Sequence, residues 1–376
     1  MNDLEERLAA RTLALVDIAS TSGHEDEILE ALEVPGSLPV ADAQDSVRWY
    51  GPAVRHPGIP LVLLAGHVDT VPPNGNLPGR MADGAVVGRG AADMKGALAV
   101  MEALAHDLLA DGEPAPASEG VDLALLFFGR EELPITQSAL LPLFERCPEV
   151  GEVDLAIVME PTANELELGC MGNLNARVTV SGRTAHSARP WLGENAIHGA
   201  VRALQGVAAS APHDVTIGGL TFREVVSVTT IEGGLAANVV PDLVRATVNY
   251  RYAPGTPPAS AEAALRAMLP GVDLEVVGNA PPGPADTTSP LVERLRRAGD
   301  LRLRPKQAWT PVAEFATIGV PAVNLGPGDP GYAHRDDERV EAAALARCYR
   351  VLRAFLEGEA THEATHEDED EDEGDT

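Results

Sequence analysis

Cysteine is scarce in this sequence of 376 residues, which contains only Cys147, Cys170 and Cys348. Three scattered cysteines give no disulfide framework, and such usage is typical of a reducing compartment. The sequence also lacks an apolar run of roughly eighteen residues, the length that a transmembrane helix needs. Its acidic N-terminus does not show the basic-then-apolar order of a secretion signal. These absences predict a cytoplasmic protein that does not enter a membrane.

Positive charge is scarce as well. The 28 Lys and Arg residues face 57 Asp and Glu residues, which gives a formal net charge of −29. Eleven acidic side chains and no Lys or Arg lie in 357–376, so the rest of the chain still carries −18. A body of this charge repels phosphate groups, so nucleic acid is not expected as a partner. We expect 358–376 to be a disordered acidic tail.

The acidic tail contains one pattern that is known from metal sites. His362-Glu363-Ala364-Thr365-His366 matches the H-E-x-x-H motif of zinc proteases. That motif requires a helix whose apolar face holds both histidines rigidly on one metal ion. Here the motif is surrounded by Glu and Asp without apolar periodicity, so we interpret it as a chance match.

Apolar patterns of two kinds alternate over much of the chain. Hydrophobic residues make up 45% of the sequence, enough for a substantial core. Stretches of helical spacing alternate with short continuous apolar runs that indicate buried strands: 4–19, 59–65, 94–109, 121–128 and 155–159. This alternation predicts an α/β fold, a mostly parallel sheet with helices on both faces. We expect 1–172 and 283–357 to form this domain.

The pattern changes between these two parts. The segments 175–181, 225–231 and 244–252 alternate like half-exposed strands, and the helical segment 196–209 lies between the first two. An antiparallel sheet with helices on one face is the simplest interpretation. We therefore expect 173–282 to be a smaller α+β domain that is inserted into the first domain.

Three of the predicted buried strands run directly into imidazole or carboxylate side chains. The first leads to His67 and Asp69, the second to Glu131 and Glu132, and the third to Glu160. In open parallel sheets, ligands bind at the carboxyl ends of the strands. These side chains are therefore expected to face one site.

Two further residues extend this set. Asp93 precedes the long helical stretch, where the helix dipole favours a carboxylate, and His334 follows the Gly- and Pro-rich loop 326–331. Nitrogen and oxygen donors of this kind suit zinc, and also cobalt or manganese. The sequence therefore predicts a site for divalent metal ions.

Several longer motifs accompany these residues, namely the glycine-rich run 88–96 and the segments 183–198, 238–242 and 322–330. Together with the His-x-Asp, Glu-Glu and Glu-Pro pairs, they make the sequence resemble the zinc-dependent M20 peptidase and deacylase family. The resemblance covers the whole chain except the acidic tail. Among the members of that family, the sequence is most similar to the succinyl-diaminopimelate desuccinylases of the actinobacterial type.

The resemblance implies a zinc-exopeptidase-like catalytic domain with an inserted lid and dimerisation domain. It also implies two divalent metal ions, in the first place zinc. Asp93 would bridge the two ions, with His67 and Glu160 on one and Glu132 and His334 on the other. A shared carboxylate partly neutralises two dications that lie roughly 3.5–4 Å apart. In relatives, the peptide bond after the bridging Asp is cis.

The implied catalytic residues are Asp69, Glu131 and His186. Asp69 would hydrogen-bond the second ring nitrogen of His67 and fix its tautomer. Glu131 would act as general base on a water whose pKa the metal ions lower toward about 7, and would then protonate the leaving amine. His186 would reach the site of the neighbouring subunit and donate to the oxyanion, a contribution of about 3 kcal/mol. This role would require a homodimer.

The implied substrate contacts are Asn238, Arg251, Thr310 and Gly326. Arg suits a carboxylate because it can pair with both oxygens, although Arg251 also fits an ordinary charge on a strand surface. The implied substrate is a small acylated amino acid, N-succinyl-LL-2,6-diaminopimelate, an intermediate of lysine biosynthesis. Hydrolysis of its amide bond would release succinate and LL-2,6-diaminopimelate.

The match departs from the family near residue 310. Pro311 and Glu314 stand where many relatives have Asp and Arg. Loss of a cation and gain of Glu314 should weaken recognition of a second carboxylate, which keeps open a deacylase for acetylornithine, another acylated amino acid or a small peptide. A catalytically silent binding or regulatory protein on the same scaffold is the alternative from a different class. The presence of Glu131 and of all five candidate ligands argues against it.

Overall fold

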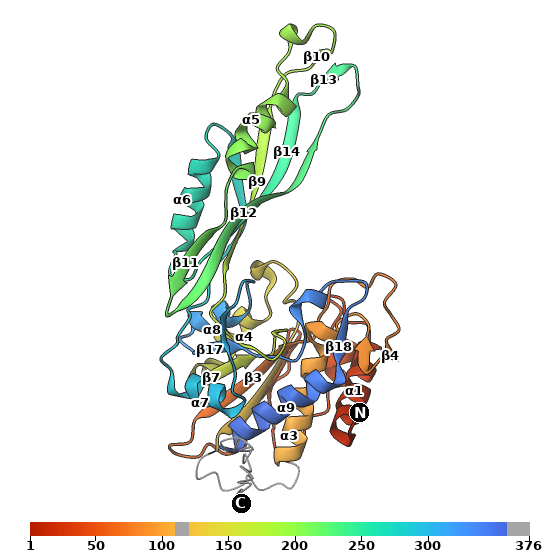
Figure 1. Cartoon of the computed structure of the whole chain (residues 1–376), viewed down its shortest axis with the longest axis vertical. Helices are drawn as coiled ribbons and strands as arrows, with labels where there is room; N and C mark the ends of the chain where they lie inside the picture. Colours follow the sequence, from red (N-terminus) through yellow and green to blue (C-terminus); the bar gives the residue numbers. More distant parts are fainter. Residues whose placement is uncertain (110–119, 359–376) are drawn as a thin grey trace, which may run out of the picture.

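The computed structural model describes residues 1–109 and 120–358 and shows a larger body that carries an elongated arm (Figure 1). The arm consists of the elements between residues 172 and 280, and the body consists of the elements before and after them. The H-E-x-x-H pattern and the predicted acidic tail, apart from Gly358, lie outside the described residues. Within the described ranges, no helix is long and apolar enough to cross a membrane.

An eight-stranded sheet forms the centre of the body, in the order β1-β2-β6-β3-β7-β17-β8-β16. The four neighbouring strands β6, β3, β7 and β17 run parallel to one another, and the antiparallel pairings lie toward the two edges. All residues of β3 and β6 are buried, as their continuous apolar runs predict. The strands are β1 (Val40–Asp42), β2 (Val47–Tyr50), β3 (Leu61–His67), β6 (Asp122–Phe128), β7 (Leu155–Val158), β8 (Leu166–Leu168), β16 (Leu303–Pro305) and β17 (Ala322–Asn324).

Helices cover both faces of this sheet. On one face, four helices share a hydrophobic core with Val62 and Leu64: α1 (Asp3–Val16), α3 (Gly96–Leu109), α7 (Pro290–Ala298) and α9 (Ala342–Glu357). On the other face, α4 (Leu140–Arg146) and α8 (Val312–Thr317) pack with Leu61 and Leu63. Successive side chains of a strand point to opposite faces, so β3 contributes to both cores. The predicted α/β fold with a mostly parallel sheet is confirmed.

A short helix and a small sheet also belong to the body. The short helix α2 (Asp26–Glu30) follows α1, and a three-stranded sheet has the order β18-β5-β4. Its strands are β4 (Arg80–Ala82), β5 (Ala85–Val87) and β18 (Arg339–Glu341). The pairing of β18 with β5 brings the C-terminal part of the chain beside residues 85–87.

The start of α3 differs from the sequence prediction. The helix begins at Gly96 rather than at Met94, because Ala91–Lys95 form a separate π-helical turn, η1, in which Asp93 and Met94 lack helical φ and ψ values. The peptide bond between Asp93 and Met94 is cis, as the resemblance implied. Met94 is buried like the helix residues after it, so the apolar periodicity runs through the turn and hides the boundary.

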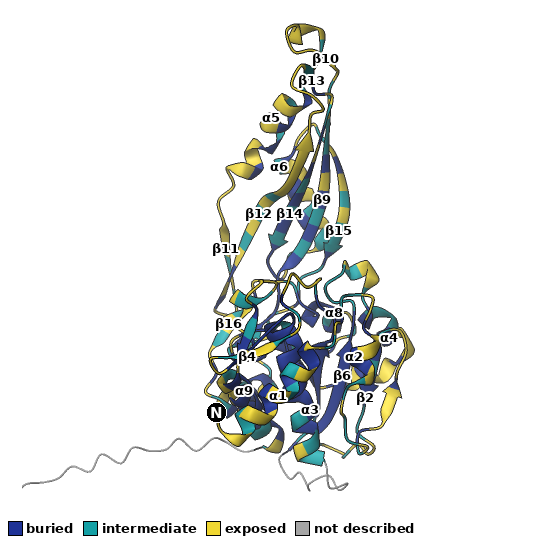
Figure 2. Cartoon of the chain, turned by 90° about the vertical axis from the view of Figure 1, so that its right-hand side faces the viewer, coloured by how far each residue is buried: buried dark blue, intermediate teal, exposed yellow. Residues whose placement is uncertain are grey.

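A five-stranded antiparallel sheet forms the arm, in the order β11-β12-β14-β9-β15. The helices α5 (Ala196–Ala208) and α6 (Pro258–Met268) pack on one face, where Leu204 and Leu265 join Leu174 and Val248 in a separate core. The strands are β9 (Gly172–Ser181), β11 (His213–Ile217), β12 (Leu220–Gly233), β14 (Leu243–Tyr252) and β15 (Asp273–Ala280). Figure 2 shows that the buried residues of the body form a thicker core than those of the arm.

The arm is joined to the body through two chain segments that pair with each other. The N–H of Cys170 donates to the carbonyl oxygen of Gly283 at 3.3 Å, and the N–H of Gly283 donates back at 3.1 Å. At the opposite end of the arm, β10 (Ala185–His186) and β13 (Val239–Val240) form a two-stranded ribbon (Figure 1). This ribbon lies far from the body sheet.

Candidate metal centre

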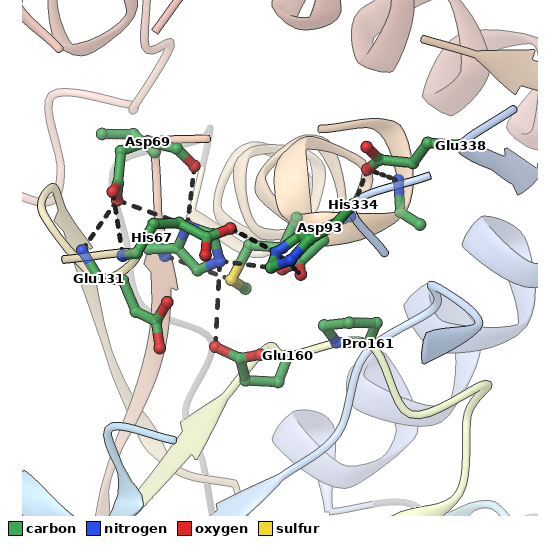
Figure 3. A network of polar contacts seen from close by, with 12 residues as sticks. His67, Asp69, Asp93, Glu131, Glu160, Pro161, His334 and Glu338 are labelled. Carbon is green, nitrogen blue, oxygen red and sulfur yellow. Dashed lines mark hydrogen bonds and ion pairs between the residues drawn. The ribbon is translucent and has the colours of Figure 1, made fainter. Parts of the chain in front are cut away.

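Three neighbouring parallel strands end in candidate ligands. His67 is the last residue of β3, whereas Glu132 follows β6 and Glu160 follows β7. Because these strands are adjacent and parallel, their carboxyl ends meet at one edge of the sheet. Asp93 from η1 and His334, which follows the 3-10 turn η5 (Pro330–Tyr332), approach the same edge (Figure 3).

Asp93 lies between the two imidazoles. Its Oδ1 is 3.0 Å from Nε2 of His67, and its Oδ2 is 3.5 Å from Nε2 of His334. Oε1 of Glu160 is 4.0 Å from Nε2 of His67, and Oε1 of Glu132 is 2.8 Å from Nε2 of His334. The five side chains thus form two groups that share Asp93, and the donor atoms of each group lie within 4.8 Å of one another.

The carboxylates of this centre fit divalent cations. Oε1 of Glu160 is buried and has no hydrogen-bond partner among the described residues. Burial and the charge of Asp93 raise the pKa of Glu160 to about 7. Burial and the neighbouring Glu160 also raise the pKa of Glu131 well above its ordinary value. Carboxyl groups so close together cannot all ionise readily without a cation, and this set of nitrogen and oxygen donors suits zinc, cobalt or manganese.

The two imidazoles bind protons strongly when no cation is present. Hydrogen bonds with Asp93 and Glu132 raise the pKa of His334 to about 10. Burial opposes protonation of His67, but hydrogen bonds with Asp69 and Asp93 outweigh burial and raise its pKa. Burial also opposes ionisation of Asp93, yet the bonds with His334 and His67 lower its pKa. A bound cation would take the place of these protons.

Asp69 contacts both His67 and the loop that carries the two adjacent glutamates. Nδ1 of His67 lies 2.9 Å from the main-chain carbonyl oxygen of Asp69 and 3.5 Å from Oδ1 of its carboxylate. A proton on Nδ1 leaves the lone pair of Nε2 facing Asp93. The carboxylate accepts the N–H groups of Glu131 at 3.1 Å and Glu132 at 3.2 Å, and the hydroxyl of Ser22 at 2.7 Å. The sequence did not predict these contacts with the glutamate loop.

His186 and Asn238 lie in the exposed region at the tip of the arm (Figure 1). Nδ1 of His186 accepts the N–H of Ala188 at 3.0 Å, and the carbonyl oxygen of Asn238 accepts the N–H of Ser187 at 2.9 Å. Within one chain, neither residue approaches the five candidate ligands. The predicted role of His186 therefore depends on a second copy of the chain.

The other three predicted substrate contacts lie closer to the body. Arg251 of β14 is half-buried, its Nε donates to Oδ1 of Asn249 at 3.1 Å, and it forms no ion pair with any described carboxylate. Burial lowers the pKa of Arg251. Thr310 is buried and its Oγ1 has no hydrogen-bond partner among the described residues. At Gly326, a Cβ would lie 2.4 Å from the carbonyl oxygen of Glu160, so only glycine allows this close approach.

Glu314, which departs from the family pattern, does not face solvent. Its side chain is buried on α8 and accepts a hydrogen bond from Oγ of Ser138. Burial raises the pKa of Glu314 to about 7. The expected effect of Glu314 on a second substrate carboxylate therefore cannot come from direct contact in this conformation.

Glu338 lies beside the candidate metal centre, next to the segment of Asp93 (Figure 3), and the sequence alone did not identify it. It follows Asp336 and Asp337, and three acidic residues in a row have the pattern of a solvated charge run. In the structure, Glu338 is only 1% exposed and contacts the segment that carries Asp93. No signal in the local sequence distinguishes it from its exposed neighbours.

A set of candidate ligands of this kind, at the carboxyl edge of a parallel sheet, is suited to a metal-dependent hydrolase. Residues 63–358 match the family model of Peptidase family M20/M25/M40, and the chain belongs to this family. It is a metal-dependent amidohydrolase.

Two curated relatives match nearly the full chain. The protein named "Putative succinyl-diaminopimelate desuccinylase DapE" of Mycobacterium tuberculosis (strain ATCC 25618 / H37Rv) is 38% identical over 95% of this chain and 100% of its own length. The succinyl-diaminopimelate desuccinylase of Corynebacterium glutamicum is 36% identical over 92% of this chain and 95% of its own length.

Solved structures share the fold at lower identity. Aminopeptidase PepT of Bacillus cereus superposes with a TM-score of 0.74 at 20% identity, covering 94% of this chain and 98% of that chain. The M20 family metallo-carboxypeptidase Sso-CP2 of Sulfolobus solfataricus gives a TM-score of 0.71 at 17% identity, covering 95% of this chain and 99% of that chain. These two similarities concern the fold alone.

Proposed function

We propose that this chain hydrolyses the amide bond of N-succinyl-LL-2,6-diaminopimelate and releases succinate and LL-2,6-diaminopimelate. The names of the two full-length relatives support the choice of substrate. The position of Asp93 supports hydrolysis at a pair of metal ions, because its two carboxylate oxygens face the Nε2 atoms of His67 and His334. A carboxylate so placed can bridge two cations.

The proposed cofactors are two divalent ions, zinc in the first place, with cobalt or manganese as substitutes. His67 and Glu160 would hold one ion, Glu132 and His334 the other, and Asp93 both. Such ions, when bound, polarise the substrate carbonyl and lower the pKa of the attacking water. Two observations support this assignment: Oε1 of Glu160 has no hydrogen-bond partner among the described residues, and His334 makes a short contact with Glu132.

Glu131 is the proposed general base. Burial and the nearby Glu160 raise the pKa of Glu131 well above its ordinary value, and a carboxylate with a raised pKa can both accept and return a proton. Its main-chain N–H is held by Asp69, which fixes the start of the side chain. In the proposed reaction, Glu131 takes a proton from the attacking water and delivers it to the leaving amine.

The arm is proposed to act as lid and dimerisation domain in a homodimer. β12 pairs with β11 only from Leu220 to Glu224, so within the described chain its outer edge is unpaired from Val225 to Gly233. Unpaired strand edges and clustered apolar side chains favour association. Large exposed apolar side chains of the arm include Trp191, Leu192, Ile197, Val201, Ile231 and Leu235.

In such a dimer, His186 of one subunit would donate to the oxyanion in the site of the other. Arg251, which pairs with none of the described carboxylates, would pair with a carboxylate of the substrate. Asn238, Thr310 and Gly326 are the further proposed substrate contacts. The three buried free cysteines support a cytoplasmic location, where thiols stay reduced.

A substrate panel tests this proposal. The purified protein, loaded in turn with zinc, cobalt and manganese, would be assayed with N-succinyl-LL-2,6-diaminopimelate, N-acetylornithine, other acylated amino acids and dipeptides. We expect the highest kcat/KM for the succinylated diamino acid and loss of activity with a chelator. A higher kcat/KM for acetylornithine or a dipeptide would contradict the proposed substrate. Two bound metal ions without hydrolysis of any panel member would contradict the proposed reaction.

A further inference from the structure

We propose that Glu338 is a positioning residue that holds Asp93 between the two candidate metal positions. The inference rests on the proposed metal centre, but not on the identity of the substrate. Glu338 touches neither group of donor atoms, so it would act through Asp93 and the segment around it.

The carboxylate of Glu338 has hydrogen-bond partners on both oxygens. Oε1 accepts the main-chain N–H groups of Ala92 at 3.2 Å and Asp93 at 3.1 Å, and Oε2 accepts Nη1 of Arg89 at 2.8 Å. Glu338 is 1% exposed and Arg89 is 4% exposed. Water therefore does not compete for these bonds.

These contacts concern the part of the chain that leaves helical geometry. Asp93 and Met94 lack helical φ and ψ values, so η1 is not held by a regular helical ladder at this point. Ala92 and Asp93 also lie in the first turn of η1, where N–H groups have no acceptor within the helix, and both donate to Glu338. A buried N–H group without an acceptor destabilises the fold. The carboxylate of Glu338 therefore favours the main-chain position from which the Asp93 side chain projects.

Glu338 also fixes the segment that carries His334 against the segment that carries Asp93. It lies four residues after His334, and its carbonyl oxygen accepts the N–H of Gly88 at 2.9 Å. Main-chain and side-chain bonds of one residue thus tie both segments together. The 3.5 Å separation between Nε2 of His334 and Oδ2 of Asp93 depends on the relative position of these two segments.

A buried carboxylate elsewhere in the body offers a matched control. Glu102 of α3 is 2% exposed, binds the guanidinium of Arg11 at 2.7 Å and accepts the N–H of Glu33 at 2.6 Å. Its partners resemble those of Glu338, an Arg and main-chain N–H, but none of them is a candidate ligand. Substitution of Glu102 therefore shows how much stability is lost when such a hydrogen-bond network is broken away from the metal centre.

The test compares metal binding by Glu338→Gln and Glu102→Gln. Glutamine has the shape of glutamate but only one acceptor oxygen, so it can serve the N–H groups or Arg89, not both. We expect Glu338→Gln to weaken binding of both zinc ions by about 10–100-fold in competition with a chromophoric chelator. The visible absorption of the cobalt-loaded variant should change as well. Glu102→Gln should lower Tm while leaving both zinc affinities and the cobalt spectrum as in the wild type.

Wild-type zinc affinities and cobalt spectrum in Glu338→Gln would overturn the inference, and so would equal weakening by both variants. If Glu338→Gln does not fold, Arg89→Lys keeps a cation beside Glu338 but removes the guanidinium bond. We expect weaker zinc binding from that variant too, and unchanged affinity would overturn the inference. A wild-type protein that binds no divalent ion would overturn the metal centre together with the role of Glu338. Two bound ions without cleavage of the succinylated substrate would contradict the proposed substrate alone.

Discussion

The main-chain N–H of Glu131 donates a hydrogen bond of 3.1 Å to Oδ1 of Asp69. The same Asp69 residue accepts Nδ1 of His67 through its main-chain carbonyl at 2.9 Å. One residue therefore orients a proposed metal ligand and the loop of the proposed base. Changes at Asp69 should affect both metal binding and turnover.

Asp69→Asn is expected to lower kcat by about 10–100-fold, with weaker metal binding. The amide cannot accept two main-chain N–H groups and a hydroxyl, because one of its terminal atoms is a donor. Kinetics and metal titration check this expectation. Asp154→Asn is a matched control, since Oδ2 of Asp154 accepts the N–H of Leu61 at 2.7 Å at the opposite end of β3. The role of Asp69 is refuted if its variant matches the control.

Glu131→Ala should keep both metal ions and the fold but lose turnover by about 10²–10⁴-fold, because no group would accept the proton of the attacking water. Metal analysis, Tm and kcat together check this. A variant that keeps its metal ions and retains more than about a tenth of wild-type kcat would exclude Glu131 as the base.

His186→Ala should lower kcat by about 10²–10³-fold with unchanged metal content, because one donor to the oxyanion is lost. Mixing this variant with Glu131→Ala offers a sharper test of the dimer. A hybrid dimer pairs the intact Glu131 of one subunit with the intact His186 of the other and so contains one complete site. Random mixing should therefore restore about a quarter of wild-type activity. No recovery after verified subunit exchange would mean that His186 does not serve the neighbouring site.

Metal binding should release protons, and more of them at lower pH. The pKa of Glu160 is raised to about 7 and that of His334 to about 10, so near pH 8 the metal-free centre holds a proton on His334, and near pH 6 Glu160 holds one as well. Cations displace these protons, so zinc affinity should fall as the pH falls from 8 to 6. Calorimetry in buffers of different ionisation enthalpy measures the number released. Binding heats that do not depend on the buffer would contradict this prediction.

The sequence predicted the buried strands of this edge because each is a continuous apolar run. These runs located β3, β6 and β7, and the candidate ligands at their ends, such as His67 and Glu160, lie where strand direction requires. The short strands β1 and β2 were not predicted, because they have three and four residues and no long apolar run.

Other parts of the site depend on contacts between distant segments. Glu338 looks like part of a solvated acidic run, and only the approach of residues 88–93 reveals its partners. The carboxylate contacts of Asp69 likewise depend on how the loop after β6 folds back over β3. No local pattern encodes the distance between the arm tip and the body, so the sequence could not place His186 relative to the ligands.

The paired connections at Cys170 and Gly283 constrain how the arm can move. Because Cys170 and Gly283 are hydrogen-bonded to each other in both directions, the two connecting segments cannot move independently without breaking those bonds. The base of the arm also packs on the body, because Leu220 and Phe222 of β12 belong to the body core and the N–H of Arg223 donates to Oε1 of Gln307 at 3.2 Å. A small rotation of the arm at these contacts would produce a large displacement of the ribbon that carries His186. Fluorophores placed on the ribbon and on the body would report such a rotation as a change in energy transfer, because the length of the arm makes the displacement of the ribbon large.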